Sequence, residues 1–260
     1  MSTRPEWKTA PVWFIGAGPG DPELITRKGA RMIAEADLVL YAGSLVPPVI
    51  VEEVKASATV MDSAPMNLEE THAAVVETVR NGGTVARVHT GDPTLYGAIR
   101  EQMRLLDNEG IGYGVVPGVT ASFATAAASA TSLTVPDASQ SVIITRLEGR
   151  TPVPATEQLR DLAKHRCAMA IYLSAAQPER LVEELKLGGL EDDVVVVIAY
   201  RVGWPDQKII RTTIAHLCEN VATHELTRQT MFLVLPGEDG QEHFSKLYDA
   251  GFLHGFRNND

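Results

Sequence analysis

The chain has 260 residues, of which 45% are hydrophobic and 22% charged, the balance of a globular protein with a large core. A formal net charge of −10 without a basic stripe argues against nucleic acid as a partner. No apolar run approaches the ~20 residues that span a bilayer, and residues 1–10 lack the apolar core of a secretory signal. We therefore expect a cytoplasmic protein that acts on a small molecule.

The two cysteines, Cys167 and Cys218, lack Cys or His partners at the spacing of metal ligands, so we expect no metal site. One disulfide between them is an alternative to two unpaired thiols in a reducing compartment, and the second interpretation fits a cytoplasmic protein better.

Strand and helix patterns alternate through the first half of the chain, which predicts a parallel sheet with helical crossovers. The expected strands are 12–15, 38–41, 60–61, 84–88 and one that ends at 115–118. The expected helices are 24–36, one that begins after Asn67 and ends at 81–83, and 98–109. Small residues over 120–130 indicate a closely packed helix.

The composition becomes polar at 131–140, where we place a domain boundary. Beyond it we expect strands at 141–145, 168–173, 194–200, 208–213 and 230–235, and helices near 157–165 and at 178–187. A Gly-Trp-Pro-Asp turn between two of these strands predicts a hairpin, and hence some antiparallel pairing. The predicted organisation is an N-terminal α/β domain over 11–130, a C-terminal α/β domain over 137–240 and a polar tail over 241–260.

Two turns of the form Gly-Asp-Pro each follow an apolar strand, within residues 16–22 (Gly-Ala-Gly-Pro-Gly-Asp-Pro) and 89–97 (His-Thr-Gly-Asp-Pro-Thr-Leu-Tyr-Gly). In a parallel sheet both lie at the carboxyl edge, where open α/β sheets bind ligands. The first is no Rossmann fingerprint, because Asp21 stands where the third glycine belongs and Pro19 lacks an amide proton. Carboxylates and free carbonyls suit a cationic, hydroxyl-bearing cofactor such as S-adenosylmethionine better than a phosphate.

The chain resembles the tetrapyrrole methylases in three ordered blocks. These are residues 16–22 followed by Leu-Ile-Thr at 24–26, Gly-Asp-Pro at 91–93 with Tyr-Gly at 96–97, and Val-Pro-Gly-Val-Thr-Ala at 116–121. The resemblance extends over about residues 11–236. Segments 41–46, 89–103, 145–152 and 200–206 are similar to the branch that methylates precorrin-4 or cobalt-precorrin-4.

The resemblance implies two α/β domains of the class III methyltransferase type, the first with a parallel and the second with a mixed sheet. It implies S-adenosylmethionine in a trough between them, and a homodimer. By residue, it implies cofactor contacts at Pro19, Thr90, Gly91, Asp92, Leu95, Thr120, Ala121, Leu173, Ala199 and Thr230.

The reaction that the resemblance implies is methylation of C-11 of precorrin-4 to precorrin-5 in cobalamin biosynthesis. The nucleophilic ring carbon attacks the sulfonium methyl directly, so we expect alignment rather than a catalytic Ser, Cys or His. Asp92 is expected to hold the cofactor, with capping of the following helix as its alternative. For His89 we expect a structural hydrogen bond.

A precorrin carries many carboxylates, and arginine pairs with carboxylates in bidentate geometry. The candidate substrate ligands are Arg87, Arg100, Arg146, Arg150 and Arg201, each with an ordinary ion pair as the alternative. Tyr96 either stacks on the macrocycle or packs in the core. Three other functions stay open: binding without turnover, methylation at another ring position, and methylation of a diphthine intermediate.

Overall fold

A computed structural model describes residues 10–238, 240 and 245 of the chain. These residues form two compact units, one that runs to Ala124 and includes Arg201–Gln207, and one of Thr125–Tyr200 and the residues from Lys208 onward. The predicted domain limits at 130, 137 and 240 stay predictions. The predicted tail over 241–260, Ser245 apart, and residues 1–9 of the N-terminal stretch lie outside the described residues.

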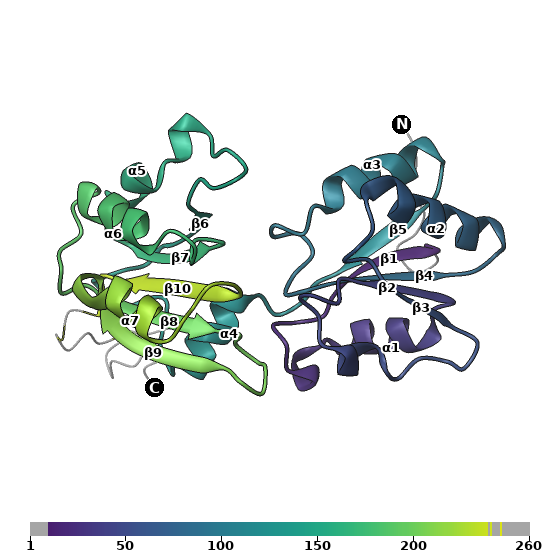
Figure 1. The fold of residues 1–260 in the computed structure, drawn as a ribbon, viewed down its shortest axis with the longest axis horizontal. Coiled ribbons are helices and arrows are strands. Elements are labelled where there is room, and N and C mark those ends of the chain that lie inside the picture. Colours follow the sequence, from purple (N-terminus) through teal and green to yellow (C-terminus); the bar gives the residue numbers. More distant parts are fainter. Residues whose placement is uncertain (1–9, 239, 241–244, 246–260) are drawn as a thin grey trace, which may run out of the picture. The chain divides into compact units, whose positions relative to one another are not determined.

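The first unit is built on a five-stranded sheet in the order β3-β2-β4-β1-β5 (Figure 1). Its strands are β1 (Val12–Gly16), β2 (Leu38–Tyr41), β3 (Thr59–Asp62), β4 (Val85–His89) and β5 (Tyr113–Val116). Every neighbouring pair is parallel, as the alternation of strand and helix patterns predicted. Strand β1 lies between β4 and β5 and is buried along its whole length, because both faces of the sheet are covered.

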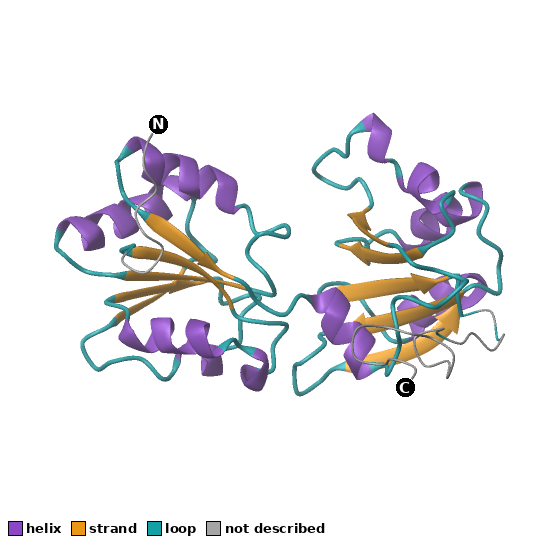
Figure 2. Cartoon of the chain, turned by 180° about the vertical axis from the view of Figure 1, so that it is seen from behind, coloured by secondary structure: helices purple, strands orange, loops and turns teal. Residues whose placement is uncertain are grey.

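Helix α1 (Arg27–Glu35) covers one face of this sheet, and α2 (Leu68–Arg80) and α3 (Ile99–Asn108) cover the other (Figures 1 and 2). The side chains of β1 alternate between two cores. Trp13 and Ile15 pack in the core that contains Ile33 of α1, whereas Val12 and Phe14 pack in the core that contains residues of α2 and α3.

The ends of these helices follow local hydrogen bonds. The predicted start of a helix at Leu24 is wrong, because Thr26 is the N-cap of α1 and its hydroxyl accepts from Gly29 N at 3.0 Å. The prediction for α2 is confirmed: Asn67 and Glu70 form a reciprocal capping box.

The second unit has a mixed five-stranded sheet in the order β6-β7-β10-β8-β9. Its strands are β6 (Val142–Arg146), β7 (Ala168–Tyr172), β8 (Val195–Tyr200), β9 (Lys208–Thr213) and β10 (Thr230–Leu235). Only β6 and β7 pair in parallel within this described sheet, and the other pairs are antiparallel. The predicted hairpin is confirmed, since Tyr200 pairs with Lys208 across β8 and β9.

The remaining helices are α4 (Ala121–Ala128), α5 (Leu159–Ala163), α6 (Pro178–Leu187) and α7 (Leu217–Thr223). A core of side chains from α5, α6 and α7 packs on the sheet around Phe232 and Ile198. Helix α7 was not predicted, because its single pair of buried residues, Leu217 and Val221, is too short a signal for a periodic pattern. Within the described part of the chain, no helix is long and apolar enough to cross a membrane.

Candidate functional site

The two Gly-Asp-Pro loops join at the carboxyl edge of the first sheet. Gly91 N donates to Gly18 O at 2.7 Å, and Ala17 N donates to His89 O at 2.8 Å. Gly18 and Gly91 form an isolated antiparallel bridge. The convergence that the parallel sheet predicted is therefore a direct backbone contact.

The third sequence block, after β5, packs on the same two loops. A Cβ on Gly118 would overlap Gly91 O and would lie 2.8 Å from the Cα of Gly16. Only glycine lets three backbones approach this closely. The loops after β1, β4 and β5 thus form one continuous backbone surface.

Asp92 links two of these loops through its side chain. Its Oδ2 accepts from Gly118 N at 3.0 Å, and its Oδ1 accepts from Thr94 N at 2.8 Å. The alternative that Asp92 caps the next helix is wrong, because the N-cap of α3 is Ala98 and no side chain caps it. A cofactor contact by Asp92 stays a prediction.

The other predicted cofactor contacts of the first unit lie on or beside the same loops. Thr90 is exposed, Leu95 and Ala121 are partly buried, and Pro19 and Thr120 are buried. The structure brings these residues to one edge of one sheet, and their contact with a cofactor stays a prediction.

The loop between β4 and α3 is strained. Tyr96 and Ala98 have positive φ angles of 56° and 48°. Between them, a Cβ on Gly97 would overlap the carbonyl oxygen of Pro93. Such left-handed residues cost of order 1–3 kcal/mol each and cluster at binding and active sites. Tyr96 is 45% exposed, so the alternative that it packs in the core is wrong.

His89 ends β4 and is buried against Phe14, with ring centroids 6.0 Å apart. Its Nε2 has no hydrogen-bond partner among the described residues, so that nitrogen does not make the structural hydrogen bond we expected. Burial, with the nearby charge of Arg87, lowers the pKa of His89 to about 3. The imidazole is therefore neutral at pH 7.

The predicted contacts of the second unit also share an edge of their sheet. Phe232 pairs with Ile171, Met231 with Ala199 and Thr230 with Tyr200, so the ends of β7 and β8 flank the start of β10. Leu173 follows β7 with a φ of 53° and is 70% exposed.

Ser174, which was not predicted as a site residue, links two strands at this edge. Its buried hydroxyl donates to Tyr172 O at 2.7 Å and accepts from Leu147 N at 2.9 Å. It thereby ties the end of β6 to the end of β7 next to the left-handed Leu173. One serine after an apolar strand carries no signal in the sequence that would reveal this role.

Arg87, a candidate substrate ligand, is engaged inside the first unit. It donates to Ser63 Oγ at 2.8 Å, to Leu40 O at 3.2 Å and, through Nε, to Gln102 Oε1 at 3.1 Å. Burial lowers its pKa to about 10. These acceptors are neutral, so the charge of Arg87 is not compensated by the groups that it binds.

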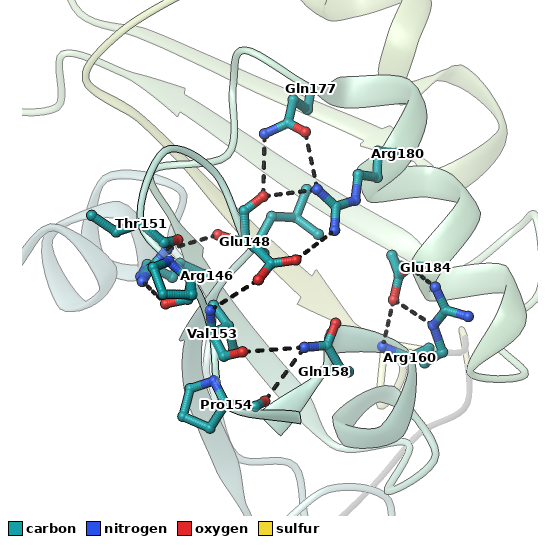
Figure 3. A network of polar contacts seen from close by, with 12 residues as sticks. Arg146, Glu148, Thr151, Val153, Pro154, Gln158, Arg160, Gln177, Arg180 and Glu184 are labelled. Carbon is teal, nitrogen blue, oxygen red and sulfur yellow. Dashed lines mark hydrogen bonds and ion pairs between the residues drawn. The ribbon is translucent and has the colours of Figure 1, made fainter. Parts of the chain in front are cut away.

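Arg146 lies in a polar network on the loop after β6 (Figure 3). It donates to Thr151 O at 3.1 Å and Pro152 O at 2.8 Å, so its guanidinium braces the loop. Glu148, on the same loop, accepts from Val153 N at 3.3 Å and pairs with Arg180 of α6 at 3.5 Å. The network fixes the loop that carries Arg150.

The remaining candidate arginines differ in their surroundings. Arg100 on α3 and Arg150 on the loop after β6 are exposed. Arg201 pairs with Asp206 at 3.0 Å, which is the ion-pair alternative. Substrate binding by these arginines stays a prediction. Across the described residues, no group of three or more His, Cys, Asp and Glu side chains is arranged to hold a metal ion.

Comparison with known proteins shows which family this chain is similar to. The model of the tetrapyrrole (corrin/porphyrin) methylases matches residues 11–218. The cobalt-precorrin-4 C(11)-methyltransferase of Priestia megaterium is 48% identical, over 95% of this chain and 97% of its own length. The precorrin-4 C(11)-methyltransferase of Pseudomonas aeruginosa is 45% identical, over 95% and 98%.

A solved structure of the cobalt-precorrin-4 methyltransferase CbiF is also similar to this chain. It is 47% identical, covers 88% of this chain and 95% of its own, and superimposes with a TM-score of 0.85. The joined glycine loops, the parallel and mixed sheets and these likenesses agree, and the chain belongs to the tetrapyrrole methylase family of methyltransferases.

Proposed function

We propose that this protein transfers a methyl group from S-adenosylmethionine to C-11 of precorrin-4, giving precorrin-5 in cobalamin biosynthesis. Cobalt-precorrin-4 is the alternative substrate, because relatives of both names match nearly the whole chain. The observation that carries the proposal is the fusion of the three family blocks into one backbone surface around Gly91 and Gly118.

The residues of this surface fit a cationic, ribose-bearing cofactor. Thr90 is exposed and carries a hydroxyl, and Gly91 next to it has a φ of 59°, a conformation that favours glycine. The Asp92 carboxylate gives the surface a negative charge, and Pro19 removes an amide that would favour phosphate. S-adenosylmethionine supplies an electrophilic methyl group on a sulfonium.

The protein contributes alignment in this proposal. The ring carbon of the substrate forms a bond to the methyl carbon while the carbon–sulfur bond breaks, so no side chain needs to act as a nucleophile. Holding the carbon, methyl and sulfur in line is worth several kcal/mol. The braced loops after β4 and β5 provide the rigid support that such an alignment requires.

Arginine side chains pair with the carboxylates of the substrate in this proposal. Arg100 and Arg150 are exposed, and the Glu148–Arg180 network holds the loop of Arg150 in place. We expect these two to contribute more than Arg146, whose donors are engaged with backbone carbonyls.

The test is product analysis with methyl-labelled S-adenosylmethionine and either precorrin-4 or cobalt-precorrin-4. The expected product carries one additional labelled methyl, assigned to C-11 by NMR and counted by mass spectrometry. A label at another ring carbon would reassign the reaction, and cofactor binding without transfer to either tetrapyrrole would favour a binding module.

The homodimer and the cytoplasmic location stay predictions. Size-exclusion chromatography with light scattering on the full chain distinguishes a dimer of 28.1 kDa subunits from a monomer.

A further inference from the structure

A segment from late in the chain is packed on the first glycine loop. Arg201–Gln207 follows β8 of the second sheet, yet it belongs to the compact unit of the first sheet. The proposed cofactor contact Pro19 lies in the loop beneath it. The methyl transfer proposed above assigns no role to residues 201–207.

The contact between segment and loop is close on both sides. A Cβ on Gly20 would lie 2.6 Å from the indole Nε1 of Trp204 and would overlap its Cδ1. A Cβ on Gly203 would lie 2.8 Å from Asp21 N and 3.2 Å from Cγ of Pro19. The backbone and the indole of the segment thus leave residues 19–21 no room to move toward it.

Trp204 is itself held in place. The guanidinium of Arg201 lies 4.2 Å from the ring centroid and pairs with Asp206 at 3.0 Å. The backbone turn is closed by Trp204 N, which donates to Arg201 O at 2.9 Å, and by Gly203 N, which donates to the Gln207 side chain at 3.0 Å. The indole is therefore a preorganised support.

Trp204 also borders an open groove of about 740 Å³. Prolines make up much of its lining, which includes Pro22, Pro47, Pro48 and Pro205. Trp204 and Gly20 both line this groove, and the indole packs on Gly20, so the fluorescence of Trp204 is sensitive to a ligand that binds the loop.

We propose that Trp204 is a positioning residue for the methyl donor. It packs against Gly20 and holds residues 19–21 in the conformation that presents Pro19 to the cofactor. This inference rests on the proposed function, because it needs S-adenosylmethionine to bind at the first glycine loop.

Two variants separate positioning from folding. Trp204→Ala removes the support, and we expect the Kd for S-adenosylhomocysteine and the KM for S-adenosylmethionine to rise about tenfold, with kcat nearly unchanged at saturation. Trp204→Phe keeps an aromatic face on Gly20, and we expect it to restore most of the affinity. Equal affinity of Trp204→Ala and the unaltered protein, by calorimetry, would overturn the proposal.

A spectroscopic experiment keeps the proposal testable if Trp204→Ala fails to fold. The chain has three tryptophans, and Trp7→Phe with Trp13→Phe leaves Trp204 as the sole emitter. Titration with S-adenosylhomocysteine is expected to shift its emission and to saturate at the concentration at which the calorimetric heat saturates. Binding without any change in emission would contradict the proposal, whereas no binding by the unaltered protein would contradict the proposed function instead.

Discussion

The carboxylate of Asp92 binds backbone amides of two loops. It accepts from the amides of Gly118 and Thr94, and so connects the loops after β4 and β5. A carboxylate that accepts amide hydrogen bonds is a strong, directional support.

We expect both Asp92→Ala and Asp92→Asn to weaken the binding of S-adenosylmethionine at least tenfold, because neither side chain keeps both bonds and the loops after β4 and β5 then lose the side chain that links them. Isothermal calorimetry measures the change. Thr94→Val is the matched control, since it removes a hydroxyl that donates to Asp92 and leaves the bond to Gly118 intact. Unchanged affinity in Asp92→Ala would remove Asp92 from the site.

His89 makes the stability of the fold depend on pH. Its pKa falls from 6.5 to about 3 on folding, so between these values the unfolded chain binds a proton that the folded chain does not. The free energy of unfolding therefore decreases as the pH is lowered from 6.5 toward 3.

His89→Phe removes this contribution. Between pH 7 and pH 5 we expect the unaltered protein to lose about 2 kcal/mol more stability than the variant, as measured by urea unfolding. The exposed His165 is the control, and His165→Gln should follow the unaltered protein. Parallel pH profiles for His89→Phe and the unaltered protein would show that His89 is protonated without penalty.

At the scale of elements, the strands and the capping signals of helices were predictable, and so was the common edge of the two glycine loops, but not the individual contacts between loops. The limits of β10 and α6 are those predicted from the sequence, and Asn67 caps the start of α2 as predicted. The start of α1 was wrong because Ile25 continues the apolar pattern of a helix, while Thr26 provides the N-cap. A local hydrogen bond decided where that helix begins.

Ser174 joins the ends of two strands, and its removal leaves the buried Leu147 amide without its acceptor. We expect Ser174→Ala to lower the free energy of unfolding by about 1–3 kcal/mol. Urea unfolding measures this, with the exposed Ser141→Ala as control. A loss within experimental error of the control would mean that the loops after β6 and β7 hold each other by other contacts.

At the scale of the whole molecule, the negative net charge of the chain opposes the approach of the proposed substrate. The chain carries a net charge of −10, and Arg87, Arg146 and Arg201 already bind groups of the protein. A polycarboxylate is therefore repelled at long range, and salt screens this repulsion.

We expect kcat/KM for precorrin-4 to rise roughly twofold between low salt and about 0.15 M NaCl. Steady-state kinetics at constant pH measure it, with the KM for S-adenosylmethionine followed in parallel. A fall with salt would show instead that a local basic surface, with Arg100 and Arg150 as its candidates, dominates substrate association.

Apolar periodicity and the three glycine-containing blocks are local signals, and they were enough to predict the fold class and the order of the elements. Which residues meet depends on the folded arrangement of the strands. The contact of Gly91 with Gly118, the bond from Gly118 to Asp92 and the packing of Trp204 on Gly20 join positions far apart in the chain. Such contacts depend on how strands order themselves in a sheet, and no local pattern of side chains records that order.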